Sequence, residues 1–372
     1  MAQTIITTSA AQTKKKWAGA LFNSSVPESY WGSHFMKEGS AESAPNAPIH
    51  LITDLEKDSG DEVKFGMYAQ LSGSPTYGDD NLEGNEESLT PYSDKILINQ
   101  VRKATDSGGE MTRKRTTNNH RMICRNKLTD WWSRFFDEAV FMNISGARGS
   151  NADYILPTAS TAAIEGQSLV ARSSGNIIYS GAATSKASLV AGDKFSLTSI
   201  DKAVTKAETE GGGSDGVIRI TPLRIDGVDK FVCLVHNYQE HDMRTSTTTG
   251  QWLDIQKAAT TNNGTKNPIF TGSLGEYRGV VLHKHNKVTR FTDYGVGSNV
   301  AAARAIFMGR QAMVAAFGSP ANGLRFDWAE EWRDYKNRLG IATKCIVGLK
   351  RPQFNSNDVN SIVIDSAAAQ PY

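Results

Sequence analysis

One stretch of this sequence constrains the fold more than any other: residues Glu110 to Ile144, which we predict to form a single long helix. Its apolar residues recur at alternating steps of four and three, which places them on one stripe of a helix. They are Leu128, Trp132, Phe135, Ala139 and Met142, flanked by Trp131 and Phe136. The other side carries charges and is expected to face solvent: Arg125, Lys127, Asp130, Arg134, Asp137 and Glu138.

Glycines mark both ends of this predicted helix. Gly108-Gly109 precedes it, and Gly146 follows as the expected C-terminal stop. At a rise of 1.5 Å per residue, the helix would be a rod of about 50 Å. Such a rod is longer than the usual helix of a globular protein, so we expect other elements to lie across it.

Residues 60–105 predict a two-stranded ribbon. Apolar residues alternate with others from Val63 to Ala69, and Ile96 and Ile98 mark the returning strand, with Val101 as its further extent. The intervening segment, Gly73–Thr90, is rich in Gly, Pro, Asn and acidic residues and cannot bury a core. Because a two-stranded ribbon is marginally stable alone in water, this one is expected to lie on another surface.

Charge divides the two stretches. Leu51 to Lys95 holds eleven acids and three bases, a net charge of −8, whereas Ile96 to Arg148 holds ten bases and five acids, a net charge of +5. An acidic loop of one subunit resting on the basic helix of a neighbour would explain this division, and two merely solvated faces would explain it equally. The candidate contact residues are Asp79, Asp80, Glu83, Glu86 and Glu87 on the ribbon, and Arg113, Arg115, Arg121 and Arg125 on the helix. The basic residues lack interleaved aromatics, which argues against direct nucleic-acid recognition.

The remainder reads as an N-terminal arm at residues 1–48, which carries aromatics, and a mixed body after the helix. We predict a hairpin between Gly216 and His236 that turns at Asp226-Gly227. The other expected helices are Phe195–Glu210, with Leu197, Ile200, Val204 and Ala207 on its buried face, Gly250–Ala259 and the Ala-rich Ala301–Phe317. The other expected strands are Val280–His285, Lys344–Leu349 and one around Ile362–Ile364.

Patterns that could support catalysis are weak. Ser199 and Lys202 match the S-x-x-K spacing of some serine hydrolases, but the partner motifs S-D-N and K-T-G are absent from the sequence. His283 and His285 share one face of a strand, a spacing that can hold zinc, although a third ligand would have to come from far away. We therefore expect no enzyme, cofactor or metal site, with a serine or zinc hydrolase as the enzymatic alternative.

The acids near the C-terminus are a further case. Glu330, Glu331 and Asp334 could supply paired carboxylates, but Trp328, Trp332 and Tyr335 interleave with them and indicate a packed amphipathic segment. The three cysteines are far apart and form no C-x-x-C pair, so we expect free thiols. No charged and apolar leader and no long apolar run occurs, so neither a signal peptide nor a membrane span is expected.

Several blocks, in order along the chain, resemble major capsid proteins of tailed bacteriophages, of the family typified by N-four-like podoviruses. The blocks are G-D-E-V-K-F within 60–84, R-N-K-L-T-D-W-W in the helix, T-G-S-L-G-E-Y-R-G-V-V-L-H-K-H-N at 271–286, A-R-A-I-F-M-G-R-Q-A at 303–312, and D-Y-K-N-R-L-G-I-A with G-L-K-R-P-Q-F-N at 334–355. The resemblance covers nearly the whole chain.

The resemblance implies an α+β, Hong Kong 97-like phage capsid fold. Residues 1–48 would be the N-terminal arm, 49–105 the extended loop and its base, and 106–194 the long spine helix with the peripheral domain. Residues 195–345 would form the axial domain, and 346–372 a C-terminal strand returning to the peripheral domain.

The resemblance also implies a function. The chain would be a major capsid protein that self-assembles as hexamers and pentamers into an icosahedral head around double-stranded DNA, without sequence-specific DNA binding. A separate scaffolding protein and a portal would be its partners, with or without a decoration protein, with assembly in the host cytoplasm and residence in the virion. A net charge of +2 suits a wall that does not grip DNA tightly. The alternative is an encapsulin-like nanocompartment shell.

Overall fold

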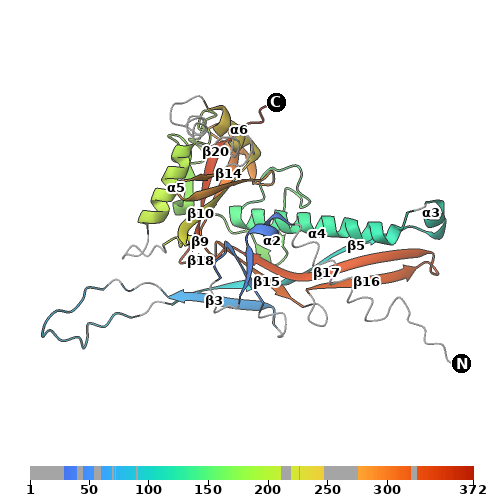
Figure 1. The fold of residues 1–372 in the computed structure, drawn as a ribbon, viewed down its shortest axis with the longest axis horizontal. Helices are drawn as coiled ribbons and strands as arrows, with labels where there is room; N and C mark the ends of the chain where they lie inside the picture. Colours follow the sequence, from blue (N-terminus) through green and yellow to red (C-terminus); the bar gives the residue numbers. More distant parts are fainter. Residues whose placement is uncertain are drawn as a thin grey trace.

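The computed structural model describes residues 29–39, 45–53, 60–68, 71, 73–88, 91–116, 118–210, 219–225, 227–246, 275–319 and 325–372. Two large sheets, a long helix that packs on both, and a ribbon that extends from one end make up the described chain (Figure 1). The predicted helix Gly250–Ala259 and most of the predicted arm lie outside the described residues.

The first sheet has six strands and is built around the long strand β17. The first half of β17 lies between β16 and β5, and its second half pairs with β15, which continues through β2 to β1. The strands are β1 (Met36–Gly39), β2 (Ile49–Ile52), β5 (Asn99–Asp106), β15 (Met313–Gly318), β16 (Phe326–Arg333) and β17 (Arg338–Lys350).

The second sheet has eight strands in the order β11-β12-β10-β14-β20-β8, with β13 paired to β14 and β9 paired to β10. The strands are β8 (Ile177–Tyr179), β9 (Leu223–Ile225), β10 (Val228–Val235), β11 (Glu276–Tyr277), β12 (Val280–Lys284), β13 (Arg290–Tyr294), β14 (Val300–Met308) and β20 (Ser361–Ala367). Helix α5 (Leu197–Thr209) packs on this sheet through the predicted apolar face, which is buried. The predicted hairpin is confirmed, since Ile225 of β9 pairs with Val228 of β10.

Shorter elements complete the described chain. The helices are α2 (Tyr30–His34), α3 (Glu110–Arg115), α4 (His120–Ser145), α6 (Asn237–Thr245) and a 3-10 turn at Ser174–Asn176. Two small hairpins are β6 (Ala162–Ile164) with β7 (Gln167–Ser168), and β18 (Gln353–Phe354) with β19 (Asn357–Asp358).

The predicted long helix is divided in two. Thr116 is extended after α3, and Asn119 begins α4 by accepting a hydrogen bond from the N–H of Met122. An asparagine at this position satisfies an N–H that has no partner inside the helix, so a new helix starts there. The end is as predicted: Gly146 has φ of 72° and closes α4 with a hydrogen bond to the Met142 carbonyl.

The predicted stripe of α4 is confirmed, because all five of its residues are buried. The expectation that Asp137 and Glu138 face solvent is wrong, since both are buried. Apolar residues of α4 share one hydrophobic cluster with residues of both sheets, for example Leu339 of β17 and Leu234 of β10. Because residues of two sheets cover α4 near Asp137 and Glu138, no side of the helix faces solvent there. The predicted pattern assumed only one covered side.

The ribbon consists of β3 (Glu62–Tyr68) and β4 (Pro91–Leu97), with Val63 opposite Ile96. It ends earlier than predicted. Ile98 bonds back to the carbonyl of Asp61, after which β5, with Val101, leaves the ribbon and pairs with β17. The chain therefore leaves the ribbon after β4 and continues as β5, a strand of the six-stranded sheet that pairs with β17.

The predicted helix Ala301–Phe317 is wrong: the segment forms β14 and β15, in different sheets. Both strands are buried on both faces, so they lack alternation and their apolar run resembles a helix. Gln311, with φ of 55°, lies in the turn that separates them.

The last strand is present as β20, but it does not join the sheet around β17 that packs on α4. It pairs with β14 and β8 in the eight-stranded sheet, so its expected return to the peripheral sheet is wrong. Conversely β15, β16 and β17 from the expected axial range lie in the six-stranded sheet. Side-chain patterns do not encode which of two sheets an apolar strand joins.

Candidate functional site

The ribbon ends in an acidic tip, residues 73–88. All five predicted acids, Asp79, Asp80, Glu83, Glu86 and Glu87, are exposed there. Two of them shape the loop: Glu87 accepts the N–H of Gly73 at 2.6 Å and Glu86 accepts the N–H of Gly84 at 2.8 Å. Tyr77 and Leu82 are 73% and 66% exposed, so the tip offers apolar as well as acidic groups.

The base of the ribbon is fixed to the body. Val63 and Ile96 pack with Ile52 and Val314 of the six-stranded sheet. Lys350 of β17 pairs with Asp94, whose carboxylate also accepts the N–H of Gln353 at 3.1 Å. A firmly held base lets the tip reach outward in a defined direction.

The four predicted arginines lie on α3 and the first turns of α4, and the contacts of Arg113 and Arg121 tie them to their own chain. Arg121 donates to Glu330 at 2.7 Å, and the Trp328 indole donates to the same carboxylate oxygen at 2.8 Å. Arg113 donates to the Asn337 carbonyl at 3.1 Å and lies 5.0 Å from the centre of the Trp332 ring. These contacts tie the helix start to the β16–β17 hairpin.

The other two arginines differ in exposure. Arg115, like its neighbour Lys114, is exposed on α3, whereas Arg125 is half-buried on α4. Beside them, the tip of the β16–β17 hairpin is open to solvent. Trp332 is 47% exposed and Tyr335 fully exposed, so the expectation that this segment is packed holds only for Trp328. We call α3, the first turns of α4 and this hairpin tip the basic end.

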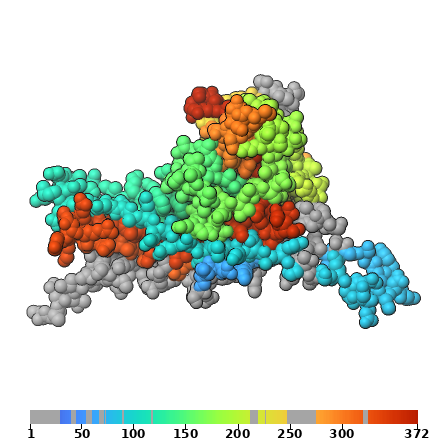
Figure 2. Space-filling view, turned by 180° about the vertical axis from the view of Figure 1, so that it is seen from behind, coloured from blue at the N-terminus to red at the C-terminus, as the bar shows by residue number. Residues whose placement is uncertain are grey.

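The acidic tip and the basic end lie at opposite ends of the long axis of the molecule (Figure 1). Seen from behind, the two again project in opposite directions from the body (Figure 2). The structure therefore does not bring the nine predicted residues together within one chain.

A buried ionic network that the sequence did not reveal holds the middle of the molecule. Three arginines donate to the last carbonyls of α4: Arg304 to Ser145 at 2.8 Å, Arg172 to Ile144 and Arg351 to Asn143, each at 3.2 Å. Positive groups at a helix C-terminus offset its partial negative charge.

Two buried aspartates balance these arginines. Asp365 of β20 accepts two bonds from Arg304, and Asp358 pairs with both Arg351 and Arg172. Burial lowers the pKa of Arg172 to about 9. The positive charge of nearby Arg351 also lowers this pKa, to a smaller extent, whereas the negative charge of Asp358 raises it. The network joins the end of α4 to β14, β19 and β20 and to Arg351, which directly follows β17. Nothing in the residue pattern distinguishes its members from surface charges.

Several residues of the enzymatic patterns make contacts within the fold. Ser199 is buried and bonds to the hydroxyl of Ser180 at 2.9 Å, while Lys202 donates to the Gly181 carbonyl. Glu330 serves Arg121, as described above. Across the described residues, no group of three or more His, Cys, Asp or Glu side chains is placed to hold a metal ion. The three cysteines are buried free thiols.

Within the part of the chain that the structure describes, no helix is long and apolar enough to cross a membrane. A family model described as phage capsid protein matches residues 5–370. The chain is 27% identical over 338 residues to the major capsid protein of Pseudomonas phage KPP25, which covers 84% of this chain and 83% of that protein.

Solved structures agree with this match. The capsid protein of Ralstonia phage GP4 is 41% identical, covers 100% of both chains and superposes with a TM-score of 0.80. The capsid protein in the asymmetric unit of cyanophage Pam1 is 18% identical, covers 92% of this chain and 93% of that one, and has a TM-score of 0.73. At 18% identity the second match speaks for the fold alone.

Proposed function

This chain belongs to the phage capsid protein family, and we propose that its copies join end to end in the capsid shell, with the acidic tip of one copy against the basic end of the next. It is a phage major capsid protein with the Hong Kong 97-like fold, and it is part of the virion. The predicted family, fold and function are confirmed at this level.

The observation that supports the end-to-end contact is the separation of opposite charges along one axis. Because the tip and the basic end point in opposite directions, the acids of one cannot pair with the bases of the other within one chain (Figure 1). A contact between two different surfaces of identical subunits is heterologous, and it forms a closed ring when the rotation between neighbours allows. Exposed Tyr77 and Leu82 would add apolar area to the contact.

The contacts within the basic end indicate which of the predicted arginines can contact a neighbouring copy directly. Arg113 and Arg121 are held by Asn337, Trp332 and Glu330 of their own chain. Arg115 and the adjacent Lys114 are exposed, and we assign them the direct contact with the neighbour's acids. Arg113 and Arg121 would act by fixing the position of α3.

The finer organisation follows the resemblance. We propose hexamers and pentamers in an icosahedral head around double-stranded DNA, formed in the host cytoplasm with a separate scaffolding protein and joined by a portal, with or without a decoration protein. The arm, extended loop, spine helix, peripheral domain and axial domain are proposed as its parts, with β20 assigned to the axial sheet. The role is structural, without catalysis or a cofactor.

An encapsulin-like nanocompartment shell is the alternative assembly. The relatives found are phage capsid proteins, which supports the phage head. A hydrolase is not supported by the placement of Ser199 and Lys202, since Lys202 bonds to a backbone carbonyl.

A charge exchange tests the end-to-end contact. Asp79→Lys with Asp80→Lys should reduce the yield of assembled particles, because lysines would face Lys114 and Arg115. Adding Lys114→Glu and Arg115→Glu to the same chain should restore much of the yield, since attraction returns with its sign reversed. Assembly of each variant is measured by sedimentation at low and moderate salt, because salt screens exposed charges.

The control is Asp130→Lys, which changes an exposed acid on α4 outside both ends. Failure of the combined variant to recover any assembly, with all variants folded, would contradict the contact. Unimpaired assembly of the tip variant alone would do so as well.

A further inference from the structure

The chain passes from the ribbon into the six-stranded sheet through one short segment, residues 97–99, which we call the ribbon joint. Up to Leu97 the chain is β4 and pairs with β3, where Glu62 lies opposite Leu97. From Asn99 onward it is β5 and pairs with β17, where Val347 lies opposite Asn99. The direction of the ribbon relative to the body is therefore decided at this joint.

Two side-chain amides bond to the backbone at the ribbon joint, and we call these two bonds the amide clamp. The N–H of Leu97 donates to the side-chain oxygen of Gln167 at 3.0 Å. The side chain of Asn99 donates to the carbonyl of Glu165 at 2.8 Å. A part-buried backbone N–H without a partner costs free energy, so Gln167 takes the place that a neighbouring strand has in a sheet.

The amide clamp connects the ribbon to the long helix. Glu165 and Gln167 belong to the β6–β7 hairpin, in which Ala163 and Ile164 are buried. These two side chains share one hydrophobic cluster with Leu128 of α4. The hairpin is thus held by the core, and it links the ribbon joint to the helix whose first turns form part of the basic end.

The ribbon joint also lies against β17. A Cβ atom placed on Gly348 would lie 2.2 Å from the carbonyl oxygen of Leu97, so this approach requires a glycine. Nearby, Lys350 donates to the carbonyl of Lys95 at 2.9 Å. The end of β4 is therefore held by two separate elements, β17 and the β6–β7 hairpin. Two attachments fix a direction, because a strand that is held by one element alone can still turn about it.

Small rotations at the ribbon joint become large displacements at the acidic tip. At about 3.3 Å per residue, the seven residues of β3 span about 23 Å, so a rotation of about 10° moves the outer end of the ribbon by about 4 Å. The tip, residues 73–88, continues beyond that end (Figure 1). A displacement of this size exceeds the reach of a hydrogen bond, so the direction of the ribbon decides which groups the tip can meet.

We propose that Gln167 is a positioning residue, which fixes the direction of the ribbon relative to α4 and thereby the angle between the acidic tip and the basic end of one chain. In a heterologous contact this angle sets the rotation between neighbouring copies, and the rotation decides whether a ring closes. This second step rests on the end-to-end contact proposed above, whereas the first step concerns a single chain.

Spin-label distance measurements on the unassembled full chain test the first step. Labels are placed at Pro91→Cys on β4 and Lys127→Cys on α4, which are both exposed positions, and the three native thiols are buried. The labelled parent chain should give one narrow distribution of distances. Gln167→Ala should broaden this distribution or shift it by a few Å, because the Leu97 N–H loses its acceptor. Gln167→Glu keeps an oxygen acceptor at the same reach and should restore the narrow distribution.

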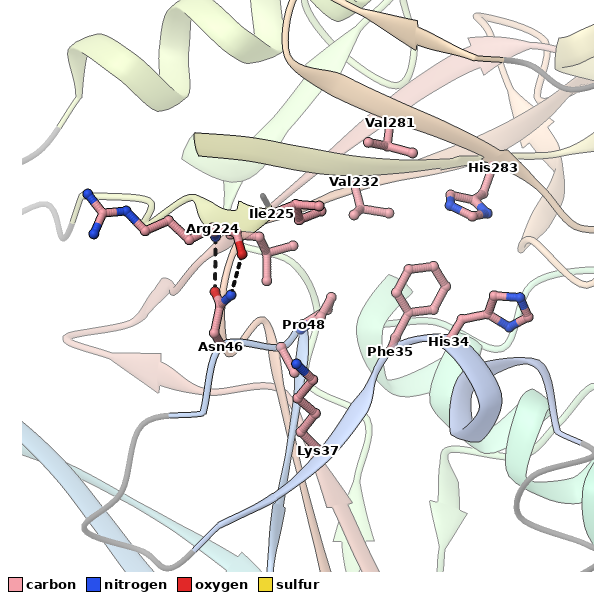
Figure 3. A pocket seen from close by; sticks show the side chains of 12 residues that line it. His34, Phe35, Lys37, Asn46, Pro48, Arg224, Ile225, Val232, Val281 and His283 are labelled. Atoms are coloured by element: carbon pink, nitrogen blue, oxygen red, sulfur yellow. Dashed lines mark hydrogen bonds between the residues drawn. The ribbon is translucent and has the colours of Figure 1, made fainter. Parts of the chain in front are cut away.

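Asn46→Ala is the matched control, because it removes another side-chain amide that bonds to the backbone. Asn46 accepts the N–H of Arg224 at 3.0 Å, donates to the Arg224 carbonyl at 2.6 Å, and lines a cavity of about 430 Å³ beside the eight-stranded sheet (Figure 3). It ties the arm to β9 instead of the ribbon to the β6–β7 hairpin, so the measured distances should stay as in the parent chain. Unchanged distances in Gln167→Ala overturn the proposal. Equal broadening in Gln167→Ala and Asn46→Ala overturns it too, because the effect would then be a general loosening of the fold.

Assembly of the same variants separates the two steps. Sedimentation of particles formed by Gln167→Ala should show a lower yield and a wider range of sizes than the wild type, and Gln167→Glu should resemble the wild type. If the distances change while the particles keep their yield and size, the end-to-end contact is wrong and Gln167 still positions the ribbon. If the distances do not change, Gln167 does not position the ribbon, whatever the particles show.

Discussion

At the scale of residues, buried charge is what distinguishes this chain. Asp365 is fully buried and accepts hydrogen bonds from Arg304 and from the hydroxyl of Tyr294 at 2.7 Å. Arg304 in turn holds the C-terminus of α4 through the Ser145 carbonyl. A single pair of side chains thus connects the long helix to two neighbouring strands of the eight-stranded sheet.

Asp365→Asn should lower the free energy of unfolding by about 3 kcal/mol or more, because it leaves the buried Arg304 without a counter-charge. Denaturant titration of the unassembled chain measures the loss. Asp293→Asn is the matched control: Asp293 pairs with Lys186 at the surface, and its loss should cost less than about 1 kcal/mol. Equal effects of the two substitutions would show that the buried network does not stabilise the fold.

At the scale of elements, the sequence predicts helices and strands that are buried on one face, and it fails for those that are buried on both. The stripe on α4, the face of α5 and the ribbon strands follow from periodicity, because each covers one side of a neighbour. β14 and β15 are covered on both sides, and so is the end of α4, where Asp137 and Glu138 are buried. Periodicity carries no information there, since burial comes from elements far away in the chain.

The contribution of α4 to the core can be measured at Trp132. This side chain is fully buried, lies 5.0 Å from Phe326 between ring centres, and donates to the Thr343 hydroxyl at 2.8 Å. Trp132→Ala should therefore cost roughly 3–5 kcal/mol in the free energy of unfolding.

Trp332→Ala is the matched control, because Trp332 is 47% exposed at the basic end and its removal should cost less than about 1 kcal/mol. Thermal or chemical unfolding of both variants makes the comparison. A small effect at Trp132 would mean that α4 contributes little to the core.

At the scale of the whole molecule, the main feature is that the acidic tip and the basic end project from the body. The sequence predicted both charged segments and, through family resemblance, the fold, but it could not show that the tip and the basic end lie on opposite sides. Their placement depends on where β5 leaves the ribbon and on how the β16–β17 hairpin meets α3. The same hairpin occupies Arg113 and Arg121, which the residue pattern alone presented as free contacts.

Electron microscopy of particles assembled from the recombinant protein, with sedimentation of the same sample, tests the end-to-end contact most directly. The account predicts closed shells in which the 73–88 tip of each copy lies against α3 of its neighbour. Shells in which the tips project freely or contact another element would contradict it. A homogeneous monomer that persists when a scaffolding protein is coexpressed would contradict it too.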